Sequence, residues 1–279
     1  MTSITDSLFE QLTIFLAYLH STSLLILASY AVIIIVLYYA FRMIFTLVVN
    51  KFLTFREVTL TRPYPDSKKI LIVGDSSAVG TGARKKEETI SGRFARDFPH
   101  SDILNLATNG SLTRDVLKQF KQAGNTVFDL IIISTGGNDI WHYTKLKSLS
   151  RDLIEVLRLA NAMSNHKVIL LWFGNEGSAP FFPFFIRWFI MRRTEQVKKV
   201  FTEVVHSEGV PLVELFSSFE GNPFIKDPKR FFARDKLHPS SEGYRLWYER
   251  MWRIMVQNGY LYDEHLAVHS SQFSGDIHE

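Results

Sequence analysis

Four short polar stretches of this chain carry the residue types that could do chemistry. They are GDSSAVG (74–80), NLATNG (105–110), GGND (136–139) and DKLHP (235–239). Three of them directly follow apolar runs that predict β-strands, and the fourth lies between the last predicted strand and the last predicted helix. A serine hydroxyl is a weak nucleophile by itself, but a histidine can take its proton and an aspartate can orient that histidine. The residue types therefore indicate nucleophilic catalysis by an oxygen atom, since the chain has no cysteine to supply a thiol.

Strand and helix signals alternate along most of the chain. Strands are expected at residues 69–73, 103–106, 130–134, 168–173 and 210–215, and helices at 87–98, 111–123, 146–163 and 241–257. Strands that are apolar on both faces and separated by helices predict a parallel sheet covered on both sides. The site of such a sheet lies at the carboxyl ends of its strands, so the polar stretches are expected to meet there.

These motifs, in this order, identify the chain as similar to a known family. GDS after the first strand, GGND after the third and DKLHPSSEGY before the last helix resemble the blocks of the SGNH hydrolases, also called GDSL esterases and lipases. The resemblance covers residues 69–260. It implies an α/β fold, a three-layer α/β/α sandwich of the flavodoxin-like type, around a parallel sheet of about five strands.

The resemblance also implies a role for individual residues. Ser76, rather than the neighbouring Ser77, would be the nucleophile, His238 its general base, and Asp235 the group that orients His238. The oxyanion of the tetrahedral intermediate would be bound by the backbone N–H groups of Ser76 and Gly110 and by the side-chain amide of Asn138. No cofactor is expected, and no cluster has the spacing of metal ligands.

The first 50 residues differ in character from the rest of the chain. Residues 1–41 contain only Asp6 and Glu10 as charged groups, and all 32 Lys and Arg residues lie from Arg42 onward. The uncharged run from Leu24 to Phe41, extended to residue 49, predicts a transmembrane helix, because about 20 apolar residues span a bilayer. The shorter apolar run Leu8–Leu19 predicts an interfacial helix.

The expected organisation places one hydrolase domain behind a membrane anchor. A tail with the interfacial helix (1–23) precedes the transmembrane helix (24–49), a linker (50–68), the hydrolase domain (69–262) and a polar tail (263–279). Basic residues follow the span and none precedes it. The positive-inside rule therefore predicts a single-pass protein of the bacterial inner membrane with a cytoplasmic catalytic domain. A buried core helix and a cleaved signal peptide are the alternatives, although the signal peptide lacks its basic start.

An aromatic segment, APFFPFFIRWFIMRR (179–193), follows the fourth predicted strand and so belongs to the rim of the site. Pro180 and Pro183 exclude a regular helix at its start. Its aromatic side chains could simply pack onto the domain core. Alternatively, Phe184, Phe185 and Trp188 would bind the substrate as an interfacial patch or acyl-binding lid, since aromatic rings flanked by arginines suit the headgroup region of a membrane.

The sequence therefore predicts a membrane-anchored serine esterase that hydrolyses carboxylic esters or thioesters, with acyl lipids or lysophospholipids as the expected substrates. One alternative is a deacetylase or O-acetyltransferase acting on envelope polysaccharide, and another is a non-catalytic membrane-tethered binding module. The composition, 46% hydrophobic and 14% aromatic, excludes a disordered chain. The net charge is +4, but the basic residues do not form the clustered motif of a nucleic-acid-binding protein. No nucleic-acid partner is therefore expected.

Overall fold

The computed structural model describes residues 2–53, 67–172, 176–215 and 221–260. The chain divides into two compact units, Met1–Phe52 and Leu53–Glu279, which are treated separately below. Most of the predicted linker (residues 54–66) and the predicted polar tail (263–279) lie outside the described residues.

The N-terminal unit is a single helix, α1 (Thr2–Leu53). The predicted interfacial helix and the predicted span are thus parts of one continuous helix. Its stretch Thr13–Arg42, 30 residues long, is apolar enough to cross a membrane, and none of its most apolar window is buried in the protein. Apolar side chains such as Leu25 and Ile34 are exposed. By length and composition, this stretch could serve as a membrane anchor or as a signal sequence.

The second unit is built on a five-stranded sheet in which all neighbouring strands are parallel. The strand order is β2-β1-β3-β4-β5. The strands are β1 (Lys68–Gly74), β2 (Ser101–Asn105), β3 (Leu130–Ser134), β4 (Val168–Trp172) and β5 (Leu212–Glu214). Every residue of β3 and β4 is buried, as expected for strands covered on both faces.

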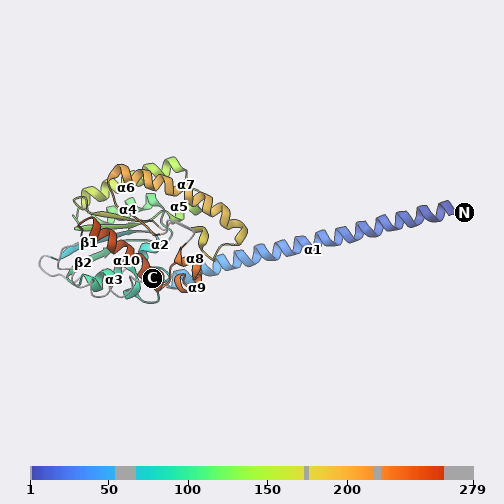
Figure 1. Ribbon diagram of the computed structural model, residues 1–279, viewed down its shortest axis with the longest axis horizontal. Coiled ribbons are helices and arrows are strands. Elements are labelled where there is room, and N and C mark those ends of the chain that lie inside the picture. The colour runs from blue at the N-terminus through green and yellow to red at the C-terminus, as the bar shows by residue number, and fades with distance from the viewer. Residues whose placement is uncertain (1, 54–66, 173–175, 216–220, 261–279) are drawn as a thin grey trace. The chain divides into compact units, whose positions relative to one another are not determined.

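Helices cover the two faces of this sheet and give the predicted three-layer sandwich. Figure 1 shows α4 (Val116–Ala123), α6 (Leu146–Met163) and α7 (Phe184–Glu208) on one face, and α3 (Ile90–Asp97) and α10 (Ser241–Gln257) on the other. The short helices are α2 (Ser76–Val79), α5 (Gly137–Trp141), α8 (Pro223–Lys226) and α9 (Pro228–Phe231). Three 3₁₀ turns complete the elements: η1 (Lys86–Glu88), η2 (Thr113–Asp115) and η3 (Glu176–Ser178).

The strand order creates a switch point between β1 and β3. From β1 the chain first adds β2 on one side of the sheet and then returns to add β3 on the other side. Connections leave β1 and β3 in opposite directions, and ligands of open α/β sheets bind in the crevice that forms outside the carboxyl ends of such strands. The segments beginning at Gly74 and Gly136 follow these two strands directly.

The aromatic segment starts without a helix, as its prolines predict. α7 begins at Phe184, immediately after Pro183, and continues for 25 residues to Glu208. Pro183 occupies the N-cap position, where its missing N–H costs no helical hydrogen bond. The prolines therefore set the start of a long helix rather than interrupting it.

Candidate active site

Ser76 lies at the first position of α2, directly after β1. Gly74, the last residue of β1, has a φ of +139°, and a Cβ atom there would lie 1.9 Å from the carbonyl oxygen of Ser134. Only glycine lets β1 and β3 approach this closely at their carboxyl ends. The backbone N–H of Asp75 then donates to Ser134 O at 2.9 Å, which fixes the turn that carries Ser76.

Ser76 and Ser77 have different surroundings although they are adjacent. The Ser77 hydroxyl is buried and hydrogen-bonded to Asp75 Oδ1 and to Ser134 Oγ, both at 2.6 Å. The Ser76 hydroxyl instead lies 3.0 Å from His238 Nε2. The geometry therefore pairs Ser76, and not Ser77, with a possible general base.

Asp235 and His238 lie in the loop between α9 and α10. His238 Nδ1 donates to Asp235 Oδ2 at 2.6 Å. The other carboxylate oxygen, Oδ1, accepts the backbone N–H groups of Leu237 (2.9 Å) and His238 (3.0 Å). A carboxylate only accepts hydrogen bonds, so the imidazole proton resides on Nδ1. Nε2 is then the acceptor for the Ser76 hydroxyl.

Two buried carboxyl groups near this loop have opposite pKa shifts. Burial raises the pKa of Asp235, but the hydrogen bond and charge of His238, with the two backbone N–H groups, outweigh it and leave the pKa below its ordinary 3.8. Burial raises the pKa of Asp75 to about 6, against the smaller lowering effect of its hydrogen bonds with Ser77. Asp235 is therefore ionised at neutral pH, as the partner of an imidazolium must be.

The loop that carries His238 packs against the turn that follows Ser76. Gly82 has a φ of +99°, and a Cβ atom there would lie within 3.0 Å of Pro239 O, Ala233 Cβ and His238 Cβ. The buried Tyr244 hydroxyl donates to Thr81 O at 2.8 Å and so links α10 to the same turn. Residues 162 positions apart in the chain, Ser76 and His238, meet because of these contacts.

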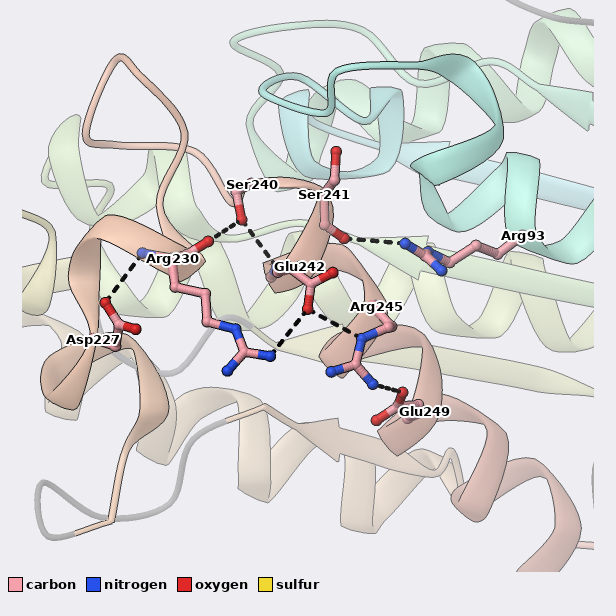
Figure 2. Close-up of polar contacts among 9 residues, drawn as sticks. Arg93, Asp227, Arg230, Ser240, Ser241, Glu242, Arg245 and Glu249 are labelled. Atoms are coloured by element: carbon pink, nitrogen blue, oxygen red, sulfur yellow. Dashed lines mark hydrogen bonds and ion pairs between the residues drawn. The ribbon is translucent and has the colours of Figure 1, made fainter. Parts of the chain in front are cut away.

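A polar network holds the start of α10, directly behind the loop. Figure 2 shows Arg93 of α3 reaching Ser241, whose carbonyl accepts from Arg93 Nη2 at 3.1 Å. Ser240 caps the helix by accepting from Gly243 N at 3.2 Å, and its hydroxyl donates to Arg230 O. A chain of ion pairs continues from the exposed Arg230 through the half-buried Glu242, Arg245 and Glu249. These contacts hold in place the segment that positions His238.

Asn138 lies beside the turn that contains Gly110, across the switch point. Residues 108–111 form a turn closed by the Ser111 N–H to Thr108 O bond (3.2 Å), and Gly110 has the positive φ, +77°, of its third position. Asn138 Nδ2, on α5, donates to Ser111 O at 3.0 Å. The amide therefore lies next to the turn that presents the Gly110 N–H.

Gln119, which the sequence analysis did not select, joins this turn to the Ser76 segment. Its side chain from α4 accepts from Gly74 N (2.7 Å) and donates to Gly74 O (2.8 Å) and to Ser111 Oγ (3.2 Å). Thr81 Oγ1 adds a second link by donating to Asn109 Oδ1 at 2.9 Å. A polar residue on the buried face of a predicted helix was the available signal.

The aromatic segment contributes to the site through its first residues. The backbone N–H of Phe181 donates to Lys236 O at 3.0 Å, inside the loop that carries Asp235 and His238. The rings of Phe181 and Phe182 contact Trp141, with centroids 6.2 and 4.0 Å away. Trp141 lies one turn after Asn138 on α5. Trp141 and Phe181 thus connect the helix that carries Asn138 to the loop that carries His238. The sequence analysis did not identify this connection.

The predicted substrate-binding residues have a different environment. Phe184, Phe185 and Trp188 lie on the first turns of α7, and all three are exposed. Phe184 contacts Phe185, and Trp188 contacts Phe189, with ring centroids 5.5 and 4.9 Å apart. Core packing, the alternative for this segment, holds for Phe182, which is buried, but not for these three residues.

The arrangement as a whole suits acyl transfer at an oxygen nucleophile. A hydroxyl, an imidazole and an ionised carboxylate are connected in series by hydrogen bonds of 3.0 and 2.6 Å. Backbone and amide N–H groups lie around the same strand ends, where an oxyanion could bind. Among the residues that the structure describes, no three His, Asp or Glu side chains form a group that could hold a metal ion.

Comparisons with solved structures show the fold. A member of the lipolytic protein G-D-S-L family from Veillonella parvula shares the fold with a TM-score of 0.55 at 15% identity, covering 68% of this chain and 99% of that chain. TesA matches with a TM-score of 0.51 at 20% identity, covering 70% and 100%. The acetylxylan esterase Axe2 from Geobacillus stearothermophilus matches with a TM-score of 0.51 at 20% identity, covering 67% and 94%. The fold is therefore that of the SGNH hydrolases, as the sequence predicted.

The family follows from the sequence itself. Residues 72–246, more than half of the chain, match the GDSL-like Lipase/Acylhydrolase family. This chain belongs to that family and is a hydrolase acting on ester bonds. No curated protein sequence matches it.

Proposed function

We propose that this chain is a membrane-anchored serine esterase in which Ser76, His238 and Asp235 form the catalytic triad. The observation that carries the proposal is the hydrogen-bonded series from Ser76 Oγ through the His238 ring to the Asp235 carboxylate. The Ser76 oxygen attacks the ester carbonyl while His238 Nε2 accepts the hydroxyl proton. Asp235 holds the resulting imidazolium through Nδ1.

The tetrahedral intermediate carries its negative charge on the former carbonyl oxygen. We assign the backbone N–H groups of Ser76 and Gly110 and the Asn138 amide as its donors, and their location around the same strand ends supports this. His238 then protonates the departing alkoxide, which leaves an acyl group on Ser76. Water, deprotonated by His238, attacks this acyl-enzyme, releases the carboxylic acid and restores the Ser76 hydroxyl.

The proposed substrates are acyl lipids or lysophospholipids, with an ester or a thioester at the cleaved bond. This proposal is supported by Phe184, Phe185 and Trp188, whose exposed aromatic side chains could contact an apolar acyl group. Replacing these three residues with polar ones should lower kcat/KM on long-chain esters more than on acetyl esters. Equal activity of the variant and the wild type on long-chain esters would remove these residues from the substrate-binding site.

The experiment that tests the function is a hydrolysis series over acyl chain length with the full-length protein and its Ser76→Ala variant. We expect the wild type to prefer long acyl chains, and Ser76→Ala to lose both turnover and labelling by a fluorophosphonate probe. A preference for acetyl esters would retain the mechanism but favour a deacetylase acting on envelope polysaccharide. A folded wild-type protein that is neither labelled nor active would favour a non-catalytic binding module.

We also propose that α1 is a single-pass anchor in a bacterial inner membrane, with the hydrolase domain in the cytoplasm. The uncharged run and the basic residues that follow it, beginning at Arg42, support this orientation. Reporters that are active on only one side of the membrane, fused to the C-terminus, test the orientation. Activity of a periplasmic reporter would reverse it, and a soluble mature protein without residues 1–50 would identify α1 as a signal sequence instead.

A further inference from the structure

The first turns of α7 present an unusually apolar surface to solvent. Five consecutive or near-consecutive side chains are exposed, and together they are called the aromatic face here: Phe184, Phe185, Ile186, Trp188 and Phe189. Phe184 is 82% exposed and Trp188 is 55% exposed. A contiguous cluster of large apolar side chains on a surface marks an interaction site, whereas scattered ones do not.

The aromatic face cannot turn inward, because the opposite side of the same helix is already packed. Phe182 and Ile190, which flank the face in the chain, are buried in the domain core. Arg187 Nε donates to Phe182 O at 3.0 Å and holds the first turn against the preceding segment. A Cβ atom on Gly177 would lie 2.3 Å from Met191 Cγ, so η3 packs closely against α7 at this level. The exposure is thus a property of a fixed helix.

Arginines lie on the same turns as the aromatic face. Arg187 is half-buried and Arg192 is exposed, whereas Arg193 is buried. The nearest acidic residues in the chain are Glu176 and Glu195. The guanidinium of Arg192 lies over the Trp188 ring, 5.4 Å from its centroid. Aromatic rings beside arginines match the headgroup region of a membrane, where the rings reach the acyl boundary and the cations meet anionic phosphates.

We propose that the aromatic face docks on the surface of a lipid bilayer that contains anionic phospholipid. A bilayer needs no matching groove on the protein. The positive charge of the arginines attracts an anionic surface, whereas it would repel a basic protein partner. The apolar stretch Thr13–Arg42 of the same chain would hold the domain near such a surface at high effective concentration. The docking rests on the proposed anchor, but not on the proposed chemistry of Ser76, and it would present the site to lipids that are still in the membrane.

The chain contains a natural reporter for this proposal. Four of its five tryptophans are buried or half-buried in the domain, and α1 has none. Trp188 is the exposed one and belongs to the aromatic face. Quenching of tryptophan emission by lipids with brominated acyl chains therefore reports whether Trp188 enters the bilayer.

The test uses the full-length protein reconstituted into vesicles of phosphatidylcholine and phosphatidylglycerol, with and without brominated phosphatidylcholine. We expect the wild type to lose roughly one fifth of its emission in brominated vesicles, the share of one tryptophan in five, while Trp188→Phe loses almost none. Phe184→Ser with Phe185→Ser, which keeps Trp188, should reduce the quenching at least twofold. Replacing phosphatidylglycerol with phosphatidylcholine should also weaken it.

Three results would overturn the docking. Equal and minimal quenching of the wild type and Trp188→Phe would leave Trp188 outside the bilayer. Protection of Trp188 from acrylamide that grows with protein concentration, without quenching by bromolipid, would identify a second copy of the chain as the occupant. Loss of the protein from the vesicles would refute the anchor as well. Hydrolysis of a soluble ester by the same samples tests the proposed chemistry separately.

Discussion

Replacing Asp235 with asparagine separates two tasks that one carboxylate performs. Oδ1 anchors the loop by accepting the backbone N–H groups of Leu237 and His238, at 2.9 and 3.0 Å. Oδ2 holds His238 Nδ1 at 2.6 Å. An asparagine can keep the first task through its amide oxygen. Its NH₂ group, however, donates to Nδ1 and selects the imidazole tautomer with the proton on Nε2, which cannot accept the proton of Ser76.

The expected loss follows from that change of tautomer. In a Ser-His-Asp triad, an aspartate-to-asparagine substitution that leaves the geometry intact lowers kcat by about 10⁴, or about 5 kcal/mol of transition-state stabilisation. Because the pKa of Asp235 is already lowered, the wild type has the ionised carboxylate throughout neutral pH. The full effect should therefore be measurable at pH 7.

The assay is hydrolysis of a soluble chromogenic ester by wild type, Asp235→Asn and Asp235→Ala, each checked for folding by circular dichroism and tryptophan emission. Asp235→Ala also removes the acceptor of two half-buried backbone N–H groups. We therefore expect its free energy of unfolding, measured by urea titration, to fall by about 2 kcal/mol. Asp235→Asn should retain nearly the stability of the wild type. Turnover of Asp235→Asn within tenfold of the wild type would refute the role given to this carboxylate.

Three further predictions concern the surrounding residues. Asn138→Ala should lower kcat by about 10²–10³, with a smaller change in KM, because it removes one oxyanion donor. Steady-state kinetics on a soluble ester would measure this effect. A near-normal kcat would exclude Asn138 as an oxyanion donor. The raised pKa of Asp75, about 6, means that the folded protein binds more protons than the unfolded chain between about pH 4 and 6. Stability should therefore fall as the pH rises through this range, and Asp75→Asn should remove about 3 kcal/mol of this fall in urea titrations at pH 4 and pH 7.5; parallel pH profiles for the two proteins would contradict it. Trp141→Ala, next to the Phe181 segment that contacts the His238 loop, should change the ratio of kcat/KM between octanoyl and acetyl esters several-fold; an unchanged ratio would place the ring outside the acyl site.

Much of the fold was predictable because local pattern and tertiary environment agree. The run LIIIS at 130–134 is apolar at almost every position, and it forms β3 with the predicted bounds because both sheet faces are covered. The amphipathic helices Leu146–Met163 and Ser241–Gln257 also have the predicted bounds. Element ends were less predictable where a cap decides them. α3 begins at Ile90 rather than residue 87, since Thr89 accepts from Gly92 N at 3.0 Å and the preceding residues form a 3₁₀ turn.

The aromatic segment shows where sequence reasoning stopped. Its composition permitted core packing or a surface role, and hydrophobicity alone could not divide the segment between them. The structure buries Phe182 and exposes Phe184, because Pro183 starts a helix whose orientation is set by Ile190 and the residues beyond it. Which face of a helix meets the core depends on contacts with distant elements, and the local sequence pattern does not specify those contacts.

The sequence by itself determined the class of this protein. The order of the motifs, the apolar strands and the absence of cysteine led to an SGNH hydrolase with an oxygen nucleophile and an apolar N-terminal helix. Residue types and spacing did not separate the two adjacent serines; the family resemblance favoured Ser76, and the tertiary structure shows the contacts that distinguish them. Ser77 is engaged by Asp75 and Ser134, whereas Ser76 meets His238 across 162 positions of sequence. The physical reason is that hydrogen-bond partners are set by the packing of strands and loops far apart in the chain, which residue types and spacing do not specify.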